Sequence, residues 1–225
     1  IKYFEEETNH LEKFYNYKNL KLLNKHQVKD EIQSNIYESG LINYGSYHIN
    51  PLKFLLGIAN QIKSTKIKVF ENTPITKIIE HEDSVYCYSN LKKIKSKKVI
   101  IGCNGYLDNL LSNIRKRFMP INNYVIATEP LGEKKARELI KNNHAVCDTR
   151  FIIDYYRFSE DWRLIFGGGE TYSAMFVKNS KNFVKNRMDK VFPILKDCKI
   201  DFSWGGTLAI TINRLPHFGT LMKNK

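Results

Sequence analysis

The stretch that most constrains the fold is residues 97–106, which read Lys-Lys-Val-Ile-Ile-Gly-Cys-Asn-Gly-Tyr. Val99 to Ile101 form an apolar run without polar alternation, which is typical of a strand covered on both faces in a mostly parallel sheet. Gly102 and Gly105 follow, and glycine lets a backbone turn sharply or approach a ligand closely. Ligands bind beyond the carboxyl ends of strands in open α/β sheets, so this turn is a candidate cofactor site. A plain strand-to-loop turn is the alternative interpretation.

The composition is that of a folded protein, because 42% of the 225 residues are hydrophobic. That content supports one large domain or two small ones. The sequence contains no run of roughly 18 apolar residues, the length that a membrane-spanning helix needs, and no signal-peptide core at its start. The four cysteines are far apart, so the sequence indicates neither a zinc site nor a disulfide framework. We therefore expect no metal site, reduced thiols and a cytoplasmic protein.

The formal net charge of +13 raises the possibility of a nucleic-acid partner. The lysines are nevertheless scattered among Asn and Ile along the whole chain, a pattern that biased composition produces without any partner. The one dense basic run, residues 92–98, alternates with Ile94 and Ser96 and indicates the solvated face of a hairpin. We expect no nucleic-acid partner. The alternative from another functional class is a basic RNA- or anion-binding module, which predicts a contiguous Lys/Arg face and salt-sensitive binding.

Two helices are indicated in the first third of the chain. Asn24 with Gln27 resembles a capping box and predicts a short helix. Asn50 and Pro51 suit the N-cap and the first position of a second helix. Apolar residues then recur with helical spacing at positions 52, 55, 56, 59 and 62. This amphipathic face predicts packing on a sheet, in the core.

Strands are predicted after the second helix, at residues 67–70, 74–79, 85–89, 91–96 and 99–101. Their order indicates a crossover into a parallel sheet with an antiparallel hairpin inserted. The rest of the chain predicts helices at 107–117, 133–142 and 183–192, and strands at 124–128, 145–148, 151–158, 162–167 and 200–212. We interpret Gly167-Gly168-Gly169 as a strand exit, because no Lys-Ser or Lys-Thr follows it as in a phosphate loop. Gly205-Gly206 is expected to break the last strand.

Several segments, in this order and at this spacing, resemble the FAD-dependent amine and D-amino-acid oxidase (DAO) family, and in particular its γ-glutamylputrescine oxidoreductase branch. The segments that carry the resemblance are residues 45–53, 73–75, 103–107, 119–120, 127–131, 204–206 and 213–219. The family's G-x-G-x-x-G fingerprint and its C-terminal glycine-rich segment have no counterpart, so the chain is interpreted as a fragment truncated at both ends. Because the fingerprint turn supplies the helix N-terminus that holds pyrophosphate, we expect these residues alone to bind FAD poorly.

The resemblance implies a mixed α+β and α/β fold. Part of a Rossmann-type FAD-binding domain would occupy residues 1–117, an antiparallel-sheet substrate domain would occupy 118–202, and 203–225 would return to the first domain. It also implies that the bend at 102–105 and the tail at 204–216 converge beside the dinucleotide. The residues that would contact FAD are Ile75, Cys103, Asn104, Gly105, Gly205, Gly206, Arg214, Leu215 and Pro216.

The resemblance further implies oxidation of an amine at the carbon that bears the nitrogen, giving an imine that water hydrolyses. Arg214 is the candidate for a positive charge near the flavin, and His48 is the second catalytic candidate. A structural arginine and a packing histidine are the alternatives. Substrate candidates are Tyr155, Tyr156, Arg157 and Trp204, where Tyr155 and Arg157 share one face of a strand and Tyr156 the other. A sheet core with an exposed arginine would also explain the strand.

The expected substrate is a small-molecule amine resembling γ-glutamylputrescine. A sarcosine or glycine oxidase, or a D-amino-acid dehydrogenase of the same fold, is the alternative. An arginine that clamps an α-carboxylate would favour that alternative.

Overall fold

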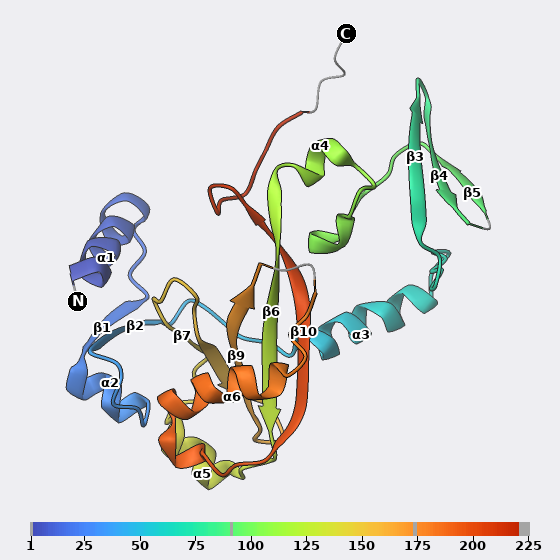
Figure 1. Ribbon diagram of the computed structural model, residues 1–225. Helices are drawn as coiled ribbons and strands as arrows, with labels where there is room; N and C mark the ends of the chain where they lie inside the picture. Colours follow the sequence, from blue (N-terminus) through green and yellow to red (C-terminus); the bar gives the residue numbers. More distant parts are fainter. Residues whose placement is uncertain (1, 91, 173–174, 221–225) are drawn as a thin grey trace. The chain divides into compact units, whose positions relative to one another are not determined.

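The computed structural model describes residues 2–90, 92–172 and 175–220 (Figure 1). The chain divides into two compact units. The first unit comprises Ile1–Leu56, Asn123–Glu170 and Phe176–Gly205, and the second comprises Gly57–Asn122, Thr171–Met175 and Gly206–Lys225. Both units are therefore discontinuous in the sequence, and the strands near residues 122 and 205 contribute to both.

The first unit begins with a small α/β segment. Its elements are α1 (Lys2–Tyr15), β1 (Leu20–Asn24), α2 (Lys25–Glu31) and β2 (Ser39–Asn43), and β1 pairs with β2 in antiparallel fashion. The predicted capping box is confirmed at the start of α2. The Asn24 side chain accepts from the Gln27 amide at 3.0 Å, and the Gln27 side chain accepts from the Asn24 amide at 3.0 Å.

A five-stranded sheet carries the core of the first unit. Its strand order is β10-β6-β9-β8-β7, built from β6 (Phe118–Thr128), β7 (Val146–Cys147), β8 (Tyr155–Phe158), β9 (Leu164–Thr171) and β10 (Ile200–Thr211). The pairs β7–β8 and β8–β9 are antiparallel. The short elements α5 (Glu133–Leu139) and η2 (Pro193–Leu195) and the longer α6 (Ser180–Val191) accompany the sheet. The antiparallel strands predicted for this region are confirmed.

The helix α6 lies across one face of this sheet (Figure 1). The helix predicted at 183–192 is confirmed, and its residues Val184, Met188 and Val191 are fully buried and join Tyr124 and Phe166 of the sheet in one apolar cluster. The Asn179 side chain caps the helix by accepting from the Asn182 amide at 3.2 Å. Burial of these residues, rather than helix propensity, is what fixes α6 on the sheet.

The second unit holds most of α3 (Pro51–Lys63) and a three-stranded meander, followed by the short helices η1 (Asn104–Leu107) and α4 (Ser112–Arg115). The meander consists of β3 (Ile75–His81), β4 (Ser84–Ser89) and β5 (Lys93–Ser96), which pair in antiparallel fashion. The predicted hairpin is therefore confirmed. Asn50 also caps α3 as predicted, accepting from the Lys53 amide at 3.1 Å.

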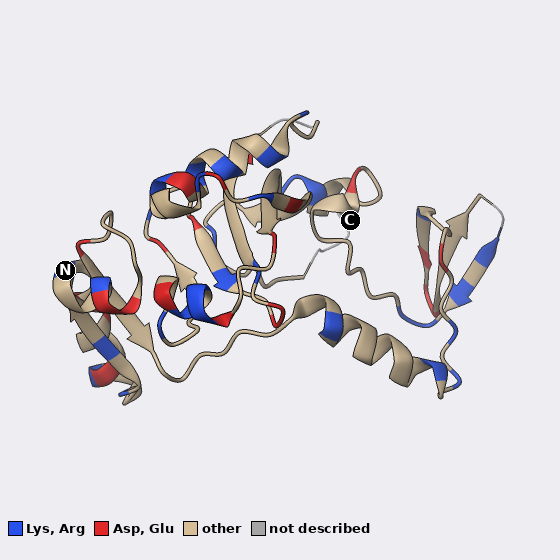
Figure 2. Cartoon of the chain, turned by 90° about the horizontal axis from the view of Figure 1, so that it is seen from below, with Lys and Arg blue, Asp and Glu red and all other residues tan. Residues whose placement is uncertain are grey.

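One face of the meander is basic and aromatic. Tyr88 lies between Lys77 and Lys93 in the strand register, and the Lys93 ammonium lies 4.0 Å from the centre of the Tyr86 ring. Figure 2 shows Lys and Arg on helices and strands of both units, with Asp and Glu among them. Most of the positive charge is thus dispersed, and the lysines of β5 are exposed as the sequence predicts.

The apolar face of α3 is exposed, which contradicts the prediction that it lies in the core. Leu52 is 63% exposed and Leu55 is 61% exposed, and α3 has no buried residue. The amphipathic pattern predicted the helix correctly, because the pattern and the cap are local. Burial also requires an apolar partner, and no sheet in the described part of the chain covers this face.

Two predicted strands are absent from the described part of the chain. Residues 67–70 and 99–101 form no strand, and Ile100 is 97% exposed. A strand exists only where neighbouring strands bond to its backbone, and these residues have none beside them. The prediction of a buried strand at Val99–Ile101 is therefore wrong, and the sheets with a defined register are antiparallel.

Three smaller predictions also need correction. The helix predicted at 107–117 is replaced by the short elements η1 and α4, and Met119-Pro120 lies inside β6. Gly167–Gly169 lie within β9 rather than at its exit, and β10 continues through Gly205 and Gly206. Glycine signals a turn only where no neighbouring side chain needs the space, and here such side chains are present. Among the described helices, none combines the length and apolarity that crossing a bilayer requires.

Candidate functional site

Within the second unit, η1 is bonded to β10. The Asn104 side-chain oxygen accepts from the Ala209 amide at 2.9 Å, and the Tyr106 hydroxyl accepts from the Thr207 amide at 2.9 Å. The sequence separations are 105 and 101 residues. These bonds confirm that the bend near residue 105 and the tail strand converge, which is the arrangement that the sequence resemblance required.

Gly105 makes this approach possible. It is buried, and a Cβ atom at this position would lie 2.7 Å from the Thr207 carbonyl oxygen and 2.8 Å from the Thr207 carbonyl carbon. Both neighbours are backbone atoms that cannot move aside like a flexible side chain. The Thr207 hydroxyl in turn donates to the Asn122 side chain of β6 at 2.8 Å. A glycine at 105 is therefore required for the contact between η1 and β10.

The other cofactor candidates of the second unit lie on several different elements. Cys103, half-buried, immediately precedes η1, and Ile75, also half-buried, starts β3 opposite Ser89. Gly206 faces the Tyr106 hydroxyl, with 3.7 Å between that oxygen and an added Cβ. The space around Gly102 is open, because nothing lies within 4 Å of a Cβ built there. Ile100, Ile101 and Gly102 are thus exposed next to the turn.

Arg214 lies in the tight turn that follows β10. Its φ angle is +59°, in the left-handed region that favours glycine, and its amide donates to the Thr211 carbonyl at 3.0 Å. The Thr211 hydroxyl donates to the Leu215 carbonyl at 2.7 Å and closes the turn. Arg214, Leu215 and Pro216 are exposed. A left-handed arginine in a turn closed by two hydrogen bonds is a strained position of the kind that occurs at functional sites.

In the first unit, β8 presents its three candidates on two faces. Tyr156 is only 2% exposed, stacks on Phe166 at 5.3 Å, and donates to the Tyr37 hydroxyl at 3.1 Å. Tyr155 and Arg157 are half-buried on the other face. Burial lowers the pKa of Arg157, and its guanidinium donates to the Phe158 carbonyl at 3.2 Å. The face with Tyr155 and Arg157 is therefore the one that a ligand can reach.

Tyr155 lies over Gly167 and reaches Asn123. Its hydroxyl donates to the Asn123 side-chain oxygen, and a Cβ at Gly167 would fall 2.1 Å from the Tyr155 ring. Burial raises the pKa of Tyr155 to about 12, so the phenol is neutral at physiological pH. Asn123 is 8% exposed and was not among the sequence candidates. The signal for it is a polar pair, Asn122-Asn123, inside an otherwise apolar strand.

The remaining candidates lie elsewhere in the first unit. Trp204 is 46% exposed on β10, and the adjacent Gly205 leaves room for Phe176, whose ring would be 2.9 Å from an added Cβ. His48 is exposed, and its Nε2 atom donates to the Asn143 carbonyl at 3.0 Å. This bond leaves Nδ1 of a neutral His48 as an acceptor. His48 also lines a pocket of about 580 Å³.

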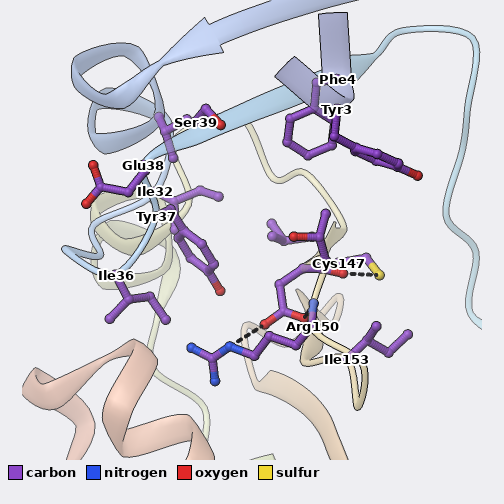
Figure 3. Close-up of a pocket in the computed structure, with 14 residues that line it drawn as sticks. Tyr3, Phe4, Ile32, Ile36, Tyr37, Glu38, Ser39, Cys147, Arg150 and Ile153 are labelled. Carbon is purple, nitrogen blue, oxygen red and sulfur yellow. Dashed lines mark hydrogen bonds and ion pairs between the residues drawn. The ribbon is translucent and has the colours of Figure 1, made fainter. Parts of the chain in front are cut away.

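A larger pocket of about 800 Å³ opens in the same unit between α1, α2 and the loop after β7 (Figure 3). Tyr37, Cys147 and Arg150 line it. Beneath it, Asp154 is fully buried and accepts from Arg150 at 3.2 Å and from Arg187 at 2.5 Å. Burial raises the pKa of Tyr37 to about 12. Sequence analysis missed this ion-pair cluster, because Asp and Arg next to a strand are indistinguishable from solvated charges.

Comparison with known proteins identifies the family. The model of the DAO family, described as FAD-dependent oxidoreductase, matches residues 2–224. The chain belongs to this family. FAD is therefore the cofactor that the family uses, and the resemblance noted from the sequence is confirmed.

Two curated relatives align with nearly the whole chain. Identity is 35% over 221 residues with the γ-glutamylputrescine oxidoreductase of Escherichia coli K12, covering 98% of this chain and 51% of that protein. Identity is 33% over 213 residues with the probable oxidoreductase OrdL of Haemophilus influenzae, covering 93% of this chain and 48% of that protein. The chain thus spans about half the length of these relatives.

Solved structures share the fold. The glycine oxidase from Geobacillus kaustophilus superposes with a TM-score of 0.78 at 12% identity, covering 96% of this chain and 57% of that one. The L-proline dehydrogenase from P. horikoshii gives a TM-score of 0.72 at 19% identity, covering 90% and 56%. These similarities show that the chain shares the mixed helix and sheet fold of these two proteins.

In the second unit, the open side of Gly102 leaves space for an uncharged part of FAD beside the exposed Ile100 and Ile101. The charged pyrophosphate has a less complete site here, since η1 is four residues long and the side chains of Asn104 and Tyr106 already occupy the amides of Ala209 and Thr207.

Proposed function

We propose that the protein to which these residues belong oxidises a primary or secondary amine of the γ-glutamylputrescine type to an imine, which water hydrolyses to an aldehyde. The observation that carries the proposal is the bonded approach of η1 to β10, which joins the two family segments expected beside the cofactor. The alignment with a γ-glutamylputrescine oxidoreductase, at 35% identity over 98% of the chain, supports the choice of substrate class. We also propose that the protein is cytoplasmic.

Bound FAD would supply the acceptor for the hydrogen and the two electrons that leave the carbon beside the substrate nitrogen. Ile75 would contact its adenine end, and Cys103, Asn104 and Gly105 would lie beside its ribose. Gly205, Gly206, Leu215 and Pro216 would lie along the ring. Arg214 would place a positive charge where negative charge accumulates, and its held turn means that little reorganisation is needed.

The substrate would bind to the accessible face of β8. Tyr155 and Arg157 are half-buried there, so both can contact a ligand, and Trp204 of β10 would provide an apolar wall. In this proposal Tyr156 supports the core rather than the substrate, because it is 2% exposed. His48 would take a proton from the substrate ammonium at Nδ1, since Nε2 is already bonded to the Asn143 carbonyl.

A sarcosine or glycine oxidase, or a D-amino-acid dehydrogenase, is the second candidate. Arg157 favours it, because a desolvated guanidinium on the same face as a tyrosine can clamp a carboxylate. The two candidates differ in where the carboxylate lies relative to the reacting nitrogen: adjacent to it in an amino acid, and distant from it in γ-glutamylputrescine.

The test is anaerobic flavin reduction in the full-length protein. We expect a yellow protein whose flavin absorbance is bleached faster by γ-glutamylputrescine than by sarcosine or D-alanine at equal concentration. A colourless protein that takes up no added FAD would contradict the proposal. Faster bleaching by sarcosine or D-alanine would transfer support to the second candidate.

A further inference from the structure

A row of hydrogen bonds runs across three neighbouring strands of the five-stranded sheet, all within the first unit. The Asn123 side chain of β6 donates from Nδ2 to the Gly169 carbonyl of β9 at 3.5 Å. The Tyr155 hydroxyl of β8 donates to Oδ1 of the same Asn123. Gly167 lies between them in β9, paired with Tyr155, and its missing side chain lets the phenol ring cross the strand.

The row has a direction. The Gly169 carbonyl can only accept, so the amide of Asn123 must turn its NH₂ group toward β9 and its oxygen toward Tyr155. The reverse orientation would bring two carbonyl oxygens together and lose the bond. The only proton of the Tyr155 hydroxyl is consequently committed to Asn123. What the phenol oxygen still offers to a ligand is a lone pair.

The charges around Tyr155 also favour its hydroxyl as a hydrogen-bond acceptor toward a ligand. The phenol stays protonated near neutral pH, because burial and then the negative charge of Glu170 raise its pKa to about 12. Glu170 is half-buried and follows Gly169 directly on β9. A negative charge acting on the hydroxyl favours a ligand that brings N–H groups or positive charge, and disfavours a carboxylate.

We propose that Asn123 is a positioning residue that fixes the Tyr155 hydroxyl as a hydrogen-bond acceptor, and that this acceptor receives an N–H group of the substrate amine. The inference rests on the proposed function, since it assigns one end of the substrate to one atom. It makes the Tyr155 hydroxyl selective for the amine end of a substrate over a carboxylate end, and the negative charge of Glu170 acts in the same direction.

The experiment compares two four-carbon probes with head groups of opposite charge, n-butylamine and butanoate, by titration calorimetry on the full-length flavin-bound protein. In Asn123→Leu the Tyr155 hydroxyl loses its acceptor, so it can donate its proton in a hydrogen bond to a ligand. We expect n-butylamine to bind about fivefold more weakly and butanoate about fivefold more tightly, as the loss or gain of one hydrogen bond predicts. Loss of packing alone would weaken both probes together.

Two further variants keep the proposal testable if Asn123→Leu does not fold. Tyr155→Phe removes the acceptor. We expect this variant to bind n-butylamine about fivefold more weakly and to bind butanoate with unchanged affinity. Tyr37→Phe is the matched control, because it removes another half-buried tyrosine hydroxyl, the one bonded to Tyr156, and should alter neither affinity. The proposal is overturned if Tyr155→Phe binds both probes like the wild type, or if Asn123→Leu weakens both equally.

The calorimetric result is separable from the proposed function. Calorimetry reports the preference for amine over carboxylate without turnover. A protein that prefers n-butylamine but whose flavin no amine reduces would refute the oxidase proposal alone. A protein whose flavin is reduced by γ-glutamylputrescine while Asn123→Leu leaves both affinities unchanged would refute the role of Asn123 alone.

Discussion

At the scale of single residues, the glycines of β9 are defined by what occupies the space beside them. An added Cβ would meet the Tyr155 ring at Gly167, Asp154 at Gly168 and the Phe183 ring at Gly169, each at less than 2.5 Å. Three consecutive glycines therefore admit three different side chains to one strand. This explains why a run that looks like a turn in the sequence is a central part of the sheet.

Gly167→Ala should be destabilising. The new methyl group overlaps the Tyr155 ring and displaces the phenol from Asn123, and overpacking of this kind costs about 1–3 kcal/mol. Gly57→Ala is the control, because Gly57 lies inside α3 with nothing within 4 Å of its Cβ, and we expect about 0.5–1 kcal/mol of stabilisation there. Urea unfolding of the two variants measures both changes. If both substitutions changed the free energy of unfolding equally and in the same direction, overlap with the Tyr155 ring would not be the cause.

The Arg163–Asp201 pair predicts a specific dependence of stability on pH. The Arg163 guanidinium, and to a smaller extent the Lys199 ammonium, hold the pKa of Asp201 below its ordinary 3.8. Arg163 Nη1 lies 2.6 Å from Asp201 Oδ2. A lowered pKa means that the folded state favours the carboxylate. This stabilisation is complete above the ordinary pKa and is lost as the pH falls through the lowered one.

Arg163→Met should therefore flatten the acid limb of the stability curve. The variant should be less stable than the wild type near neutral pH, and the difference should shrink as the pH falls below 3.8. Urea unfolding over a pH series measures the slope. Arg137→Met, which removes a half-buried arginine paired with Glu133, serves as the control and should leave the slope unchanged. A pH-independent difference for Arg163→Met would contradict the linkage.

Residue-level prediction from the sequence succeeded where a pattern is local and failed where a role depends on distant partners. The faces of Tyr155, Tyr156 and Arg157 followed from strand alternation alone. The polar pair Asn122-Asn123 marks the position, but the role of Asn123 could not be predicted, because it exists only when β6, β9 and β8 are adjacent. The buried pairing of Asp154 with Arg187 likewise joins residues that are 33 positions apart.

At the scale of elements, the helices and hairpins whose signals lie within a few residues were predicted well. The capping box of α2, the cap of α3 and the buried stripe of α6 are all present. The segments at 67–70 and 99–101 were predicted as strands from their apolar composition, yet a strand needs hydrogen-bonding neighbours. Composition specifies a tendency to be extended, whereas the partner decides whether a strand forms.

Asn24→Ala should weaken α2 measurably. The substitution removes the side-chain acceptor of the Gln27 amide and half of the capping box, which is worth about 1 kcal/mol. Urea unfolding measures the loss. Lys29→Ala, in the same helix but remote from the cap, should change the unfolding free energy by less than about 0.5 kcal/mol. If both variants lose the same free energy of unfolding, loss of the cap is not the cause of the destabilisation.

At the scale of the whole molecule, apolar burial is unevenly distributed between the two units. The cluster that includes Tyr124, Phe166 and Met188 belongs entirely to the first unit. In the second unit, the part of α3 that belongs to it has no buried residue, and the meander buries only Cys87. Since buried apolar area is the main source of stability, each unit is expected to have its own opening free energy.

Amide hydrogen exchange should separate the two units. We expect the amides of α6 and β9 to exchange slowly, because they open only with the core. The amides of α3 and β5 should exchange much faster. Exchange followed by mass spectrometry on peptides from these elements measures the difference. Equal protection of α6 and α3 would show that α3 is covered by something outside the described contacts.

The backbone contact between Gly105 and Thr207 has a consequence for variation among related sequences. The atoms of residue 207 that crowd position 105 include main-chain atoms, and the Ala209 group that Asn104 recognises is a main-chain amide, so replacing those side chains would leave much of the junction intact. Position 105 has no such freedom. We therefore expect substitutions to be tolerated at positions 207 and 209 of β10 and not at position 105.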